Sequence, residues 1–566
     1  MTHLHPHPHP NSHPASLRLA AIVLALAATT GPAVGAEPTV AFTVNASDTM
    51  IGLSNTVLVS PAAWREVAAL NRLRSPYRIK PGQVLVIPQR LMRWQAVPVA
   101  LVSSSGDVRV NDAAVAAGSA PVTLAEGQRL QTGDSGSAVL EMSDGSRFKL
   151  PPSSLAEVIN SRRYAARGGA APAPDSSPST GLFSGVLRVL SGSVEVFASK
   201  LQRARPLEVT TPTAVVGVRG THYRVSYDEA ANRATRTEVL EGQVRADTAD
   251  ASAGADVARA FGARLDAEAK PPAVVALLAA PNLGGVASRF ERPLIRFAFE
   301  PADGAVRVQV AADAAFDSVV NDQRVAAGAE VRLAGLPDGD WHLRARRIDG
   351  LGIEGFDAVR GFVLKARPEP PPSRAPRANA KQPVGAVEFA WAENLEAKSY
   401  RLQVSRDAAF KRLIVDQGDI TTSTLKTELP AVGAYFWRLA SVRANADSGP
   451  FGDALGFELK ALPEPPQGGV SEDGTRIMLN WSGRPGDRQR VELARDAAFT
   501  NIVARTELAT SQWSVEPSAG AGDYYFRYQS IEPDGYVSPY SSTLKLNVPR
   551  DWSRFWWLLA PLVLVL

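Results

Sequence analysis

The sequence predicts a mainly β, multidomain protein: one small βααβ module, one β-rich domain and three tandem β-sandwich repeats. Three observations support this fold class. The chain has 566 residues, which is more than one domain ordinarily holds. Much of it consists of short alternating apolar runs divided by Gly, Asp and Ser, as is typical of strands joined by tight turns. A motif also recurs three times in the second half with constant internal spacing.

The composition excludes several classes of site. The chain has no cysteine, so disulfides, thiolate nucleophiles and Cys-ligated zinc are absent. Five of the seven histidines lie in the first thirteen residues, and the other two, His222 and His342, are 120 residues apart. The formal charge of +4 is too small to imply nucleic-acid binding by itself. We therefore expect no metal site, no cofactor and no nucleic-acid partner.

Residues 1–36 are predicted to be a secretory signal peptide. An apolar run follows Arg18 and ends in the small residues Val34-Gly35-Ala36, which suits cleavage before Glu37. The alternative is a membrane anchor, but the apolar core is shorter than the roughly 20 residues that span a bilayer. The preceding His-Pro tract could bind metal, although an unstructured leader is the favoured interpretation. The signal peptide predicts that the chain is exported to the periplasm or cell envelope.

The other end of the chain, residues 552–566, is a hydrophobic tail. Its apolar stretch would make roughly 18 Å of helix, short of a hydrocarbon core of roughly 30 Å. Three interpretations are open: a tail that dips into a membrane behind an aromatic belt, a truncated transmembrane segment, or a tail buried against the protein. The belt would be formed by Trp552, Trp556 and Trp557. Membrane contact is the favoured interpretation.

Residues 41–90 carry the pattern of a βααβ unit. Asp48 and Thr49 are suited to cap a first helix. Trp64, Val67 and Leu70 recur at helical spacing and predict a second helix. The expected elements are a strand at 42–44, the first helix after residue 49, the second helix over 61–71, and a turn and strand in "IKPGQVLVIP" (79–88).

This unit resembles the LysM domain in the residues Asp48-Thr49-Met50, Asn71 and "IKPGQVLVIP". Ser47 stands where that family usually has glycine. The resemblance implies binding of N-acetylglucosamine-containing chains, chiefly peptidoglycan, in a shallow groove between two loops where backbone groups contribute much. The groove residues that it implies are Ser47, Asp48, Thr49, Met50, Asn71, Arg78 and Ile79.

Basic residues are concentrated in the same unit. Between Pro61 and Arg90 there is one acidic residue, Glu66, against six basic ones. A basic surface suits a wall polymer that carries carboxylates; a solvated face without a ligand is the alternative. The six are Arg65, Arg72, Arg74, Lys80, Arg78 and Arg90.

Residues 101–248 are predicted to form a β-rich domain, interrupted by a flexible loop at 164–181. Its most distinctive segment is "VTTPTAVVGVRGTHYRV" (209–225). Pro212 restricts the preceding residue to an extended conformation, and Arg219 offers a planar fork to carbonyls or a carboxylate. Gly217 and Gly220 permit positive φ or close backbone approach, and Thr221, Tyr223 and Val225 alternate on one strand face. We expect a corner that shapes the fold, with His222 on the strand surface.

With "LEGQV", this segment makes the region resemble the FecR domain. The named member of that family is a periplasmic sensor of Gram-negative bacteria that signals through a cytoplasmic anti-sigma segment. In this chain the predicted leader occupies the position of the anti-sigma segment. The resemblance therefore implies the fold and the extracytoplasmic setting, and not the signalling. Residues 249–291 are predicted to be a linker with a helix over 255–267, from the spacing of Val257, Phe261 and Leu265.

The second half contains three copies of one unit. The motif Asp-Ala-Ala-Phe begins at Asp313, Asp407 and Asp496, and a second block begins 26 residues after each Asp. The second block alternates apolar residues, which is typical of two packed sheets, and His342 falls on the opposite face. The copies resemble fibronectin type III or immunoglobulin-like sandwiches. Their expected limits are 292–366, 384–461 and 470–548, with Pro-rich spacers at 367–383 and 462–466.

These features predict a non-enzymatic envelope protein. The LysM-like module would bind peptidoglycan, and the other domains would present surfaces to an envelope protein of unknown identity. A sensor of the FecR type is the alternative, because the FecR resemblance brings signal perception with it. A peptidoglycan-active enzyme ranks third: with no Cys and two distant His, only an Asp/Glu mechanism is available, and no acidic pair stands out.

Overall fold

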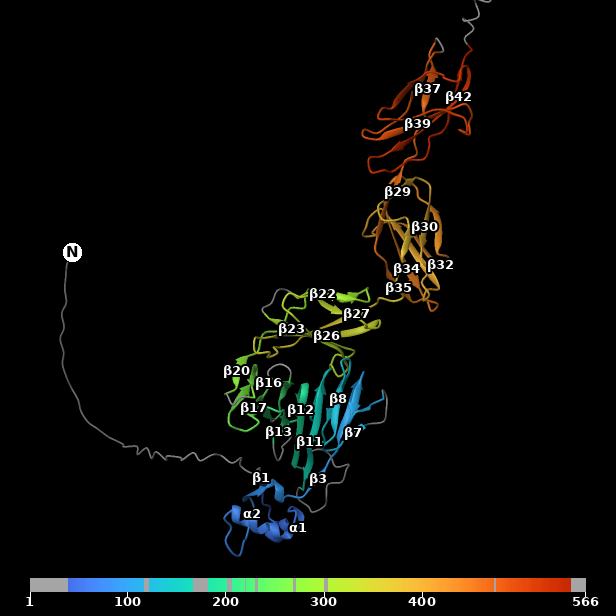
Figure 1. Cartoon of the computed structure of the whole chain (residues 1–566). Coiled ribbons are helices and arrows are strands. Elements are labelled where there is room, and N and C mark those ends of the chain that lie inside the picture. The colour runs from blue at the N-terminus through green and yellow to red at the C-terminus, as the bar shows by residue number, and fades with distance from the viewer. Residues whose placement is uncertain are drawn as a thin grey trace, which may run out of the picture. The chain divides into compact units, whose positions relative to one another are not determined.

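The computed structural model describes residues 39–116, 122–165, 182–200, 206–218, 220–229, 233–267, 271–299, 304–472 and 475–550. The expected signal peptide and hydrophobic tail lie outside these ranges. The described chain forms two compact units (Figure 1). The first extends to Ala279 and includes 317–322 and 347–356, and the second contains the remainder. The fold is mainly β and multidomain, as predicted.

The first module has the predicted order βααβ. It consists of β1 (Thr39–Thr43), α1 (Met50–Thr56), α2 (Trp64–Leu70) and β2 (Val84–Pro88), and the two strands pair antiparallel (Figure 1). The expected helix over 61–71 is divided into a 3₁₀ turn, Pro61–Ala63, and α2, and Pro61 stands at a first position that tolerates its missing N–H. Inward residues of both strands and helices form its core: Val40, Phe42, Leu53, Val67, Leu85 and Ile87.

This module is joined to the β domain by more than its chain connection. Tyr164, at the end of β11 (Leu155–Tyr164), is 3% exposed and packs into the core of the module. Arg93 Nε donates to Leu58 O at 2.7 Å, and Ala165 N donates to Arg93 O at 2.9 Å. The module therefore shares a buried aromatic residue with the next domain, and a fragment cut after Arg93 would lose it.

The β domain is a closed barrel (Figure 1). Its strand β12 (Leu182–Phe197) is long enough to serve two parts of the barrel: its first part pairs with β11, and residues 192–197 pair with β15. Gly192 lies at the change, with φ +79°, and a Cβ there would stand 2.5 Å from Ser153 O. Only glycine fits this crossing point. The other strands are β3 (Trp94–Ala96), β4 (Val99–Ser105), β5 (Val108–Val110), β6 (Ala113–Ala114), β7 (Val122–Leu124), β8 (Arg129–Thr132), β9 (Ser137–Glu141), β10 (Arg147–Leu150), β13 (Leu207–Thr210), β14 (Ala214–Val218), β15 (His222–Asp228), β16 (Ala234–Glu241), β17 (Gln243–Thr248), β18 (Gly254–Ala258), β19 (Phe261–Leu265) and β20 (Ala273–Ala276).

The expected linker over 249–291, with its helix over 255–267, is wrong. Strands β18, β19 and β20 occupy much of this segment and complete the barrel. Val257 and Leu265 are buried on different strands, whereas Phe261 is 41% exposed. Ala260, with φ +70°, makes the turn between β18 and β19. The domain therefore extends at least to Ala276.

The segment 209–225 forms the predicted corner between β14 and β15. Gly220 has φ +64°, whereas Gly217 lies within β14 in ordinary strand conformation; Arg219 lies outside the described residues. The hydroxyl of Thr235 lies 2.5 Å from that of Thr211, which ties the start of the corner to β16. His222 stacks on Phe197, with ring centroids 4.1 Å apart, so this histidine has a packing role on the strand surface.

Each repeat is a sandwich of two sheets. The sheet orders are β21-β27-β26-β23-β24 with β22-β25, then β29-β36-β34-β31-β32 with β28-β30-β33, then β40-β39-β42-β43 with β37-β38-β41; β35 is added to β34. The expected spacer over 367–383 is shorter than predicted, because its second part forms β28 and β29 of the second sandwich. The strands are β21 (Arg289–Phe290), β22 (Ile295–Phe297), β23 (Ala305–Ala311), β24 (Val319–Val325), β25 (Val331–Leu333), β26 (Gly339–Ile348), β27 (Ala358–Leu364), β28 (Ser373–Ala375), β29 (Ala380–Pro383), β30 (Ala386–Trp391), β31 (Ser399–Ser405), β32 (Leu413–Ile420), β33 (Thr424–Glu428), β34 (Gly433–Val442), β35 (Ser448–Phe451), β36 (Leu455–Lys460), β37 (Gln467–Val470), β38 (Ile477–Asn480), β39 (Arg488–Ala494), β40 (Ile502–Leu508), β41 (Gln512–Val515), β42 (Gly522–Ile531) and β43 (Leu544–Val548).

The Asp-Ala-Ala-Phe motif forms a turn that is held by hydrogen bonds to the side chain of its own aspartate. Asp407 accepts hydrogen bonds from the backbone N–H groups of Ala409 and Lys411, both at 3.1 Å. Asp496 does the same in the third repeat. The phenylalanine that ends the motif has a left-handed φ of +59°, +55° and +56° in the three copies. The motif thus fixes a backbone turn, as aspartate does in many turns.

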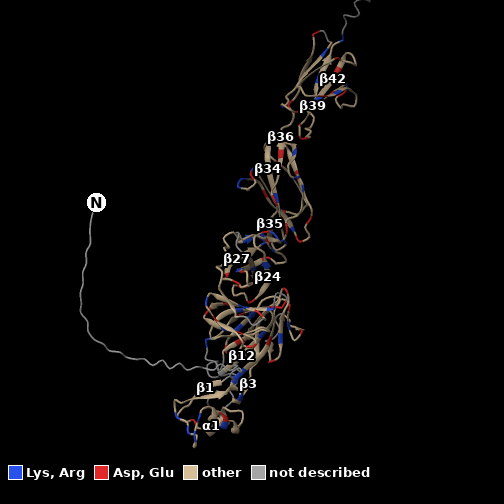
Figure 2. Cartoon of the chain, turned by 60° about the vertical axis from the view of Figure 1, so that its left-hand side comes forward, with Lys and Arg blue, Asp and Glu red and all other residues tan. Residues whose placement is uncertain are grey.

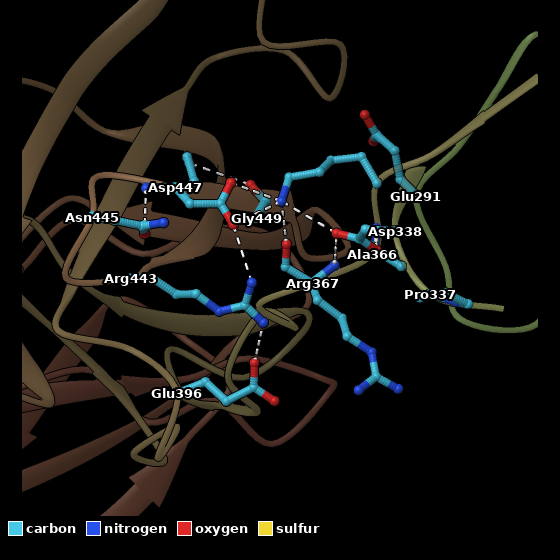
Figure 3. Close-up of polar contacts among 12 residues, drawn as sticks. Glu291, Pro337, Asp338, Ala366, Arg367, Glu396, Arg443, Asn445, Asp447 and Gly449 are labelled. Carbon is cyan, nitrogen blue, oxygen red and sulfur yellow. Dashed lines mark hydrogen bonds and ion pairs between the residues drawn. The ribbon is translucent and has the colours of Figure 1, made fainter. Parts of the chain in front are cut away.

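A lysine follows the last strand of the first repeat and bonds to the second; Figure 3 labels Asp338 and Asp447, the two carboxylates that it contacts. Lys365 Nζ lies 2.8 Å from Asp447 Oδ1 and 3.2 Å from Asp338 Oδ2. Lys460, the equivalent lysine of the second repeat, lies 3.2 Å from Glu532 Oε1 of the third. Both lysines belong to the same sequence pattern, Leu-Lys-Ala-x-Pro-Glu-Pro-Pro. The same kind of lysine–carboxylate ion pair therefore occurs at both boundaries between repeats.

Candidate functional site: a groove on the first module

A groove with a volume of about 390 Å³ lies between the start of α1 and the loop before β2. Its size is within the range of small-ligand pockets. It lies entirely in the LysM-like module. Its lining residues are Asp48, Thr49, Met50, Ile51, Trp64, Pro76, Tyr77, Arg78 and Ile79.

The polar side chains on the wall formed by α1 already make hydrogen bonds within the protein. Thr49 is the N-cap of α1, and its hydroxyl accepts from Gly52 N at 2.9 Å. Asp48 Oδ2 accepts from Asn45 N at 2.7 Å and closes the preceding turn. Ile51, the second residue of the helix, is 75% exposed. This wall therefore presents an apolar side chain and backbone to a ligand more than it presents free polar side chains.

The opposite wall is aromatic. The rings of Trp64 and Tyr77 meet edge to face, with centroids 5.0 Å apart and an interplanar angle of 66°. Tyr77 has φ +57°, and its N–H donates to Arg74 O at 2.7 Å, so a tight turn holds the ring in place. The guanidinium of Arg65 lies 5.6 Å from the centre of the Trp64 ring. Aromatic walls of this kind combine a large contact area with few rotatable bonds.

The rim of the groove is basic. No carboxylate of the described residues lies within ion-pair distance of Arg65 or Arg78. The acidic residue of this region, Glu66, is bonded to Arg90 instead. Figure 2 colours the charged residues along the ribbon of the module that carries β1 and α1. An anionic group of a ligand would meet the guanidinium of Arg78 in the groove and that of Arg65 beside Trp64, whereas Asp48, on the α1 wall, is a carboxylate that lines the same groove.

Five of the seven residues that the sequence predicted line the groove, and two do not. Ser47 is exposed outside it. Asn71 lies at the end of α2, where its Nδ2 donates to Val86 O and its Oδ1 accepts from Val86 N, both at 2.7 Å. Asn71 thus ties the helix to β2 and has little left to offer a ligand. The five lining residues are Asp48, Thr49, Met50, Arg78 and Ile79.

Sequence reasoning missed four lining residues: Ile51, Trp64, Pro76 and Tyr77. Trp64 was assigned to the apolar face of α2, and its half-buried ring in fact has one side toward the groove. Tyr77 could have been found as an aromatic residue next to a proline in an otherwise basic loop.

Other site types are not found in the described residues. Among them, no cluster of three His, Cys, Asp or Glu side chains is arranged to hold a metal ion. Within the same ranges, none of the helices has both the length and the apolar character needed to cross a bilayer.

Two family models match parts of the chain. Residues 42–88 match the LysM domain, and residues 128–245 match the family described as FecR protein. None of the curated proteins matches the chain. The matched segments are the module that carries the groove and the larger part of the barrel.

Similar folds occur among solved structures. A crystal structure from Parabacteroides distasonis, provisionally described as an anti-sigma factor, is 12% identical; the match covers 26% of this chain and 59% of that one, with a TM-score of 0.20. The FN1–FN3 domains of chicken CNTN1 are 11% identical, over 46% of this chain and 95% of that one, with a TM-score of 0.21. Fibronectin(III)-like modules of Clostridium thermocellum CbhA are 15% identical, over 31% and 93%, with a TM-score of 0.20.

Proposed function

We propose that this chain is a non-enzymatic protein of the bacterial cell envelope that binds peptidoglycan through the groove of its first module. The observation that carries the proposal is the groove itself, with an exposed Ile51 on one wall and the Trp64–Tyr77 pair on the other. It lies in the segment that matches the LysM domain. LysM, FecR and fibronectin III-like domains are binding or regulatory modules.

The chemistry of the groove suits an N-acetylated glycan. The methyl of an acetamido group is apolar and would pack on Ile51 and Met50, while a sugar ring offers an apolar face to an aromatic wall. The amide of the same group can bond to backbone N–H and C=O groups. Arg78 in the groove and Arg65 beside Trp64 favour a glycan that carries carboxylates, as peptidoglycan does.

The remaining domains would then extend from the bound wall and present surfaces to an envelope protein. The predicted signal peptide would export the chain to the periplasm or cell envelope, and the hydrophobic tail would add contact with a membrane. The barrel and the sandwiches carry the larger part of the described chain, so a partner protein is expected to bind there.

Sedimentation with insoluble peptidoglycan tests the proposal. The mature full-length chain is used, because Tyr164 of the barrel completes the core of the module. Ile51→Ala and Tyr77→Ala should lower the sedimented fraction. Val84→Ala is the matched control: Val84 is 54% exposed in the same module but does not line the groove. Equal sedimentation of all three variants would refute binding by the groove, and absence of sedimentation of the unaltered chain would refute the wall-binding function.

A second candidate is signal perception of the FecR type, favoured by the match of residues 128–245 to that family. A sensor should change transcription when the chain is removed from its cell. A transcript profile that is the same with and without the chain excludes this function.

A further inference from the structure

A second pocket, with a volume of about 280 Å³, lies where the Pro-rich segment after β36 meets the third repeat. It is independent of the groove on the first module and of the peptidoglycan proposal. Its wall includes Glu464 of the Pro-rich segment, Gly483 and Asp487 of the loop before β39, and Tyr536 of the turn after β42. Polar groups thus approach this pocket from three separate parts of the chain.

Two buried donors have no hydrogen-bond partner among the described residues: the hydroxyl of Tyr536, which lines the pocket, and Nε2 of Gln489, which does not line it but lies next to Gly483 of its wall. Gln489 is 1% exposed, and its Oε1 accepts from Ser530 Oγ at 2.7 Å, which orients the amide. Nε2 then lies 3.2 Å from where a Cβ on Gly483 would stand. An unpaired buried donor is costly, about 1–3 kcal/mol, so a group that accepts these bonds would be bound favourably.

In the second repeat, an asparagine side chain fills the position that is equivalent to this pocket. There Asn394 Nδ2 donates to Glu369 O at 2.6 Å and to Ser441 Oγ at 3.3 Å. Glu464 and Ser530 are the equivalent residues of the third repeat. The loop from Trp481 to Gln489 is one residue shorter than its counterpart from Trp391 to Tyr400 and carries glycine at position 483.

Among the described residues of the third repeat, no amide bridges Glu464 and Ser530; Glu464 O accepts from Tyr528 instead. Both residues line the pocket. A glycine and a shortened loop have therefore opened a space that an asparagine fills one repeat earlier.

The remaining polar groups decide what chemistry the pocket favours. Asp487 is 9% exposed, and its carboxylate accepts no hydrogen bond from the described residues. Lys460 and Arg484 are donors on the same wall, and both lie close to Glu532. A ligand with a full charge of either sign would meet a like charge. A hydroxyl group suits the pocket better, because it donates to a carboxylate and accepts from an amide, a phenol or a guanidinium.

We propose that this pocket is a binding site for a neutral, polyhydroxylated ligand of the size of one sugar unit. Its hydroxyls would donate to Asp487 and accept from the hydroxyl of Tyr536. The exposed Leu462 at the mouth would contact the apolar face of the ring.

Calorimetric titration of the full-length chain with methyl glycosides of glucose, galactose and mannose tests this site. These probes lack the acetamido group that the first groove is proposed to hold. At least one of them should bind, and Tyr536→Phe should weaken that binding by about 5- to 10-fold, the value of one hydrogen bond. Because the phenol makes no bond within the protein, Tyr536→Phe should leave the unfolding temperature unchanged or raise it.

Tyr525→Phe, the same substitution on β42 outside the pocket, is the control and should bind like the unaltered chain. Tyr77→Ala, in the first groove, should also leave this binding intact. The proposal is overturned if none of the glycosides binds, if the two Tyr→Phe variants bind alike, or if Tyr77→Ala abolishes the binding. The sedimentation test on peptidoglycan is unaffected by any of these outcomes.

Discussion

The guanidinium carbon of Arg438 lies 4.0 Å from the centre of the Phe410 ring. The same guanidinium donates to Gln403 Oε1 through Nε at 2.9 Å and Nη2 at 2.8 Å. This contact explains why the repeated motif ends in phenylalanine. The left-handed backbone conformation of that phenylalanine places its ring against an arginine of the second block. The equivalent pairs are Arg344 with Phe316 at 4.4 Å and Arg527 with Phe499 at 3.9 Å.

Phe410→Ala should destabilise the second repeat. The ring is 8% exposed, and its loss removes buried apolar contacts together with a cation–π contact, about 2–4 kcal/mol in all. Hydrogen exchange of peptides from β31 and β34 should become faster. Val432→Ala, which truncates a 49% exposed side chain of the same repeat, should leave that exchange unchanged. The account fails if the two variants exchange alike.

Gly192→Ala should destabilise the barrel more than an ordinary glycine replacement. Gly145 has nearly the same φ, +78° against +79°, but a Cβ there meets nothing within 4 Å. Gly145→Ala should therefore cost only the conformational penalty, about 1–2 kcal/mol. Gly192→Ala adds a clash with Ser153 O and should cost about 1–3 kcal/mol more. Denaturant unfolding of both variants measures the difference; equal values would show that β12 does not need the close approach.

Asn71→Ala should loosen the first module, with binding affected only through the fold. Its amide makes hydrogen bonds to the backbone of both α2 and β2, so its loss should cost about 1–3 kcal/mol. Exchange of the β2 amides should accelerate, and peptidoglycan binding should recover at a temperature at which the module is folded. A variant with normal exchange and absent binding would instead assign Asn71 to the ligand.

The lysine at the first boundary between repeats gives a pH dependence. A hydrogen bond from Lys365 lowers the pKa of the Asp447 carboxyl. A lowered pKa in the folded state adds stability that is present above the unfolded value of about 4 and lost as the pH falls through the folded value. Asp447 is 30% exposed, so the contribution should stay below about 1 kcal/mol.

Lys365→Met should therefore destabilise this boundary slightly at neutral pH, and the effect should shrink once the pH is low enough to protonate Asp447 and Asp338, the two carboxylates that Lys365 contacts. Hydrogen exchange of the backbone amides of the turn at 443–447, followed across this pH range, measures the change in stability. An effect that does not shrink on acidification would show that Lys365 acts through its hydrogen bond to Arg367 O or through packing.

Much of the fold follows from local patterns, and the exceptions have physical reasons. The repeats were predictable because two blocks with constant spacing must occupy equivalent places in each copy. The helix expected over 255–267 failed because the spacing of Val257, Phe261 and Leu265 is four residues. An even spacing fits one face of a strand as well as a helix, and the sequence did not reveal the turn at Ala260.

The groove was predictable to a similar degree. Asp48 and Thr49 predict a helix cap, after which Met50 enters the core and Ile51 is exposed at the groove. Tyr77 was missed because its position depends on a left-handed backbone conformation in the loop, which residue type alone does not determine. Asn71 was assigned to the ligand through the resemblance to the LysM domain, whereas its amide in fact bonds to backbone atoms of Val67 and Val86.

The most direct test of the central claim is a calorimetric titration of the full-length chain with a soluble tetramer of N-acetylglucosamine. We expect saturable binding that Tyr77→Ala abolishes or weakens at least about tenfold, equivalent to about 1.4 kcal/mol, while Val84→Ala and Tyr536→Phe leave it unchanged. Binding that is absent in the unaltered chain, or equally strong in Tyr77→Ala, would contradict recognition of the glycan by this groove.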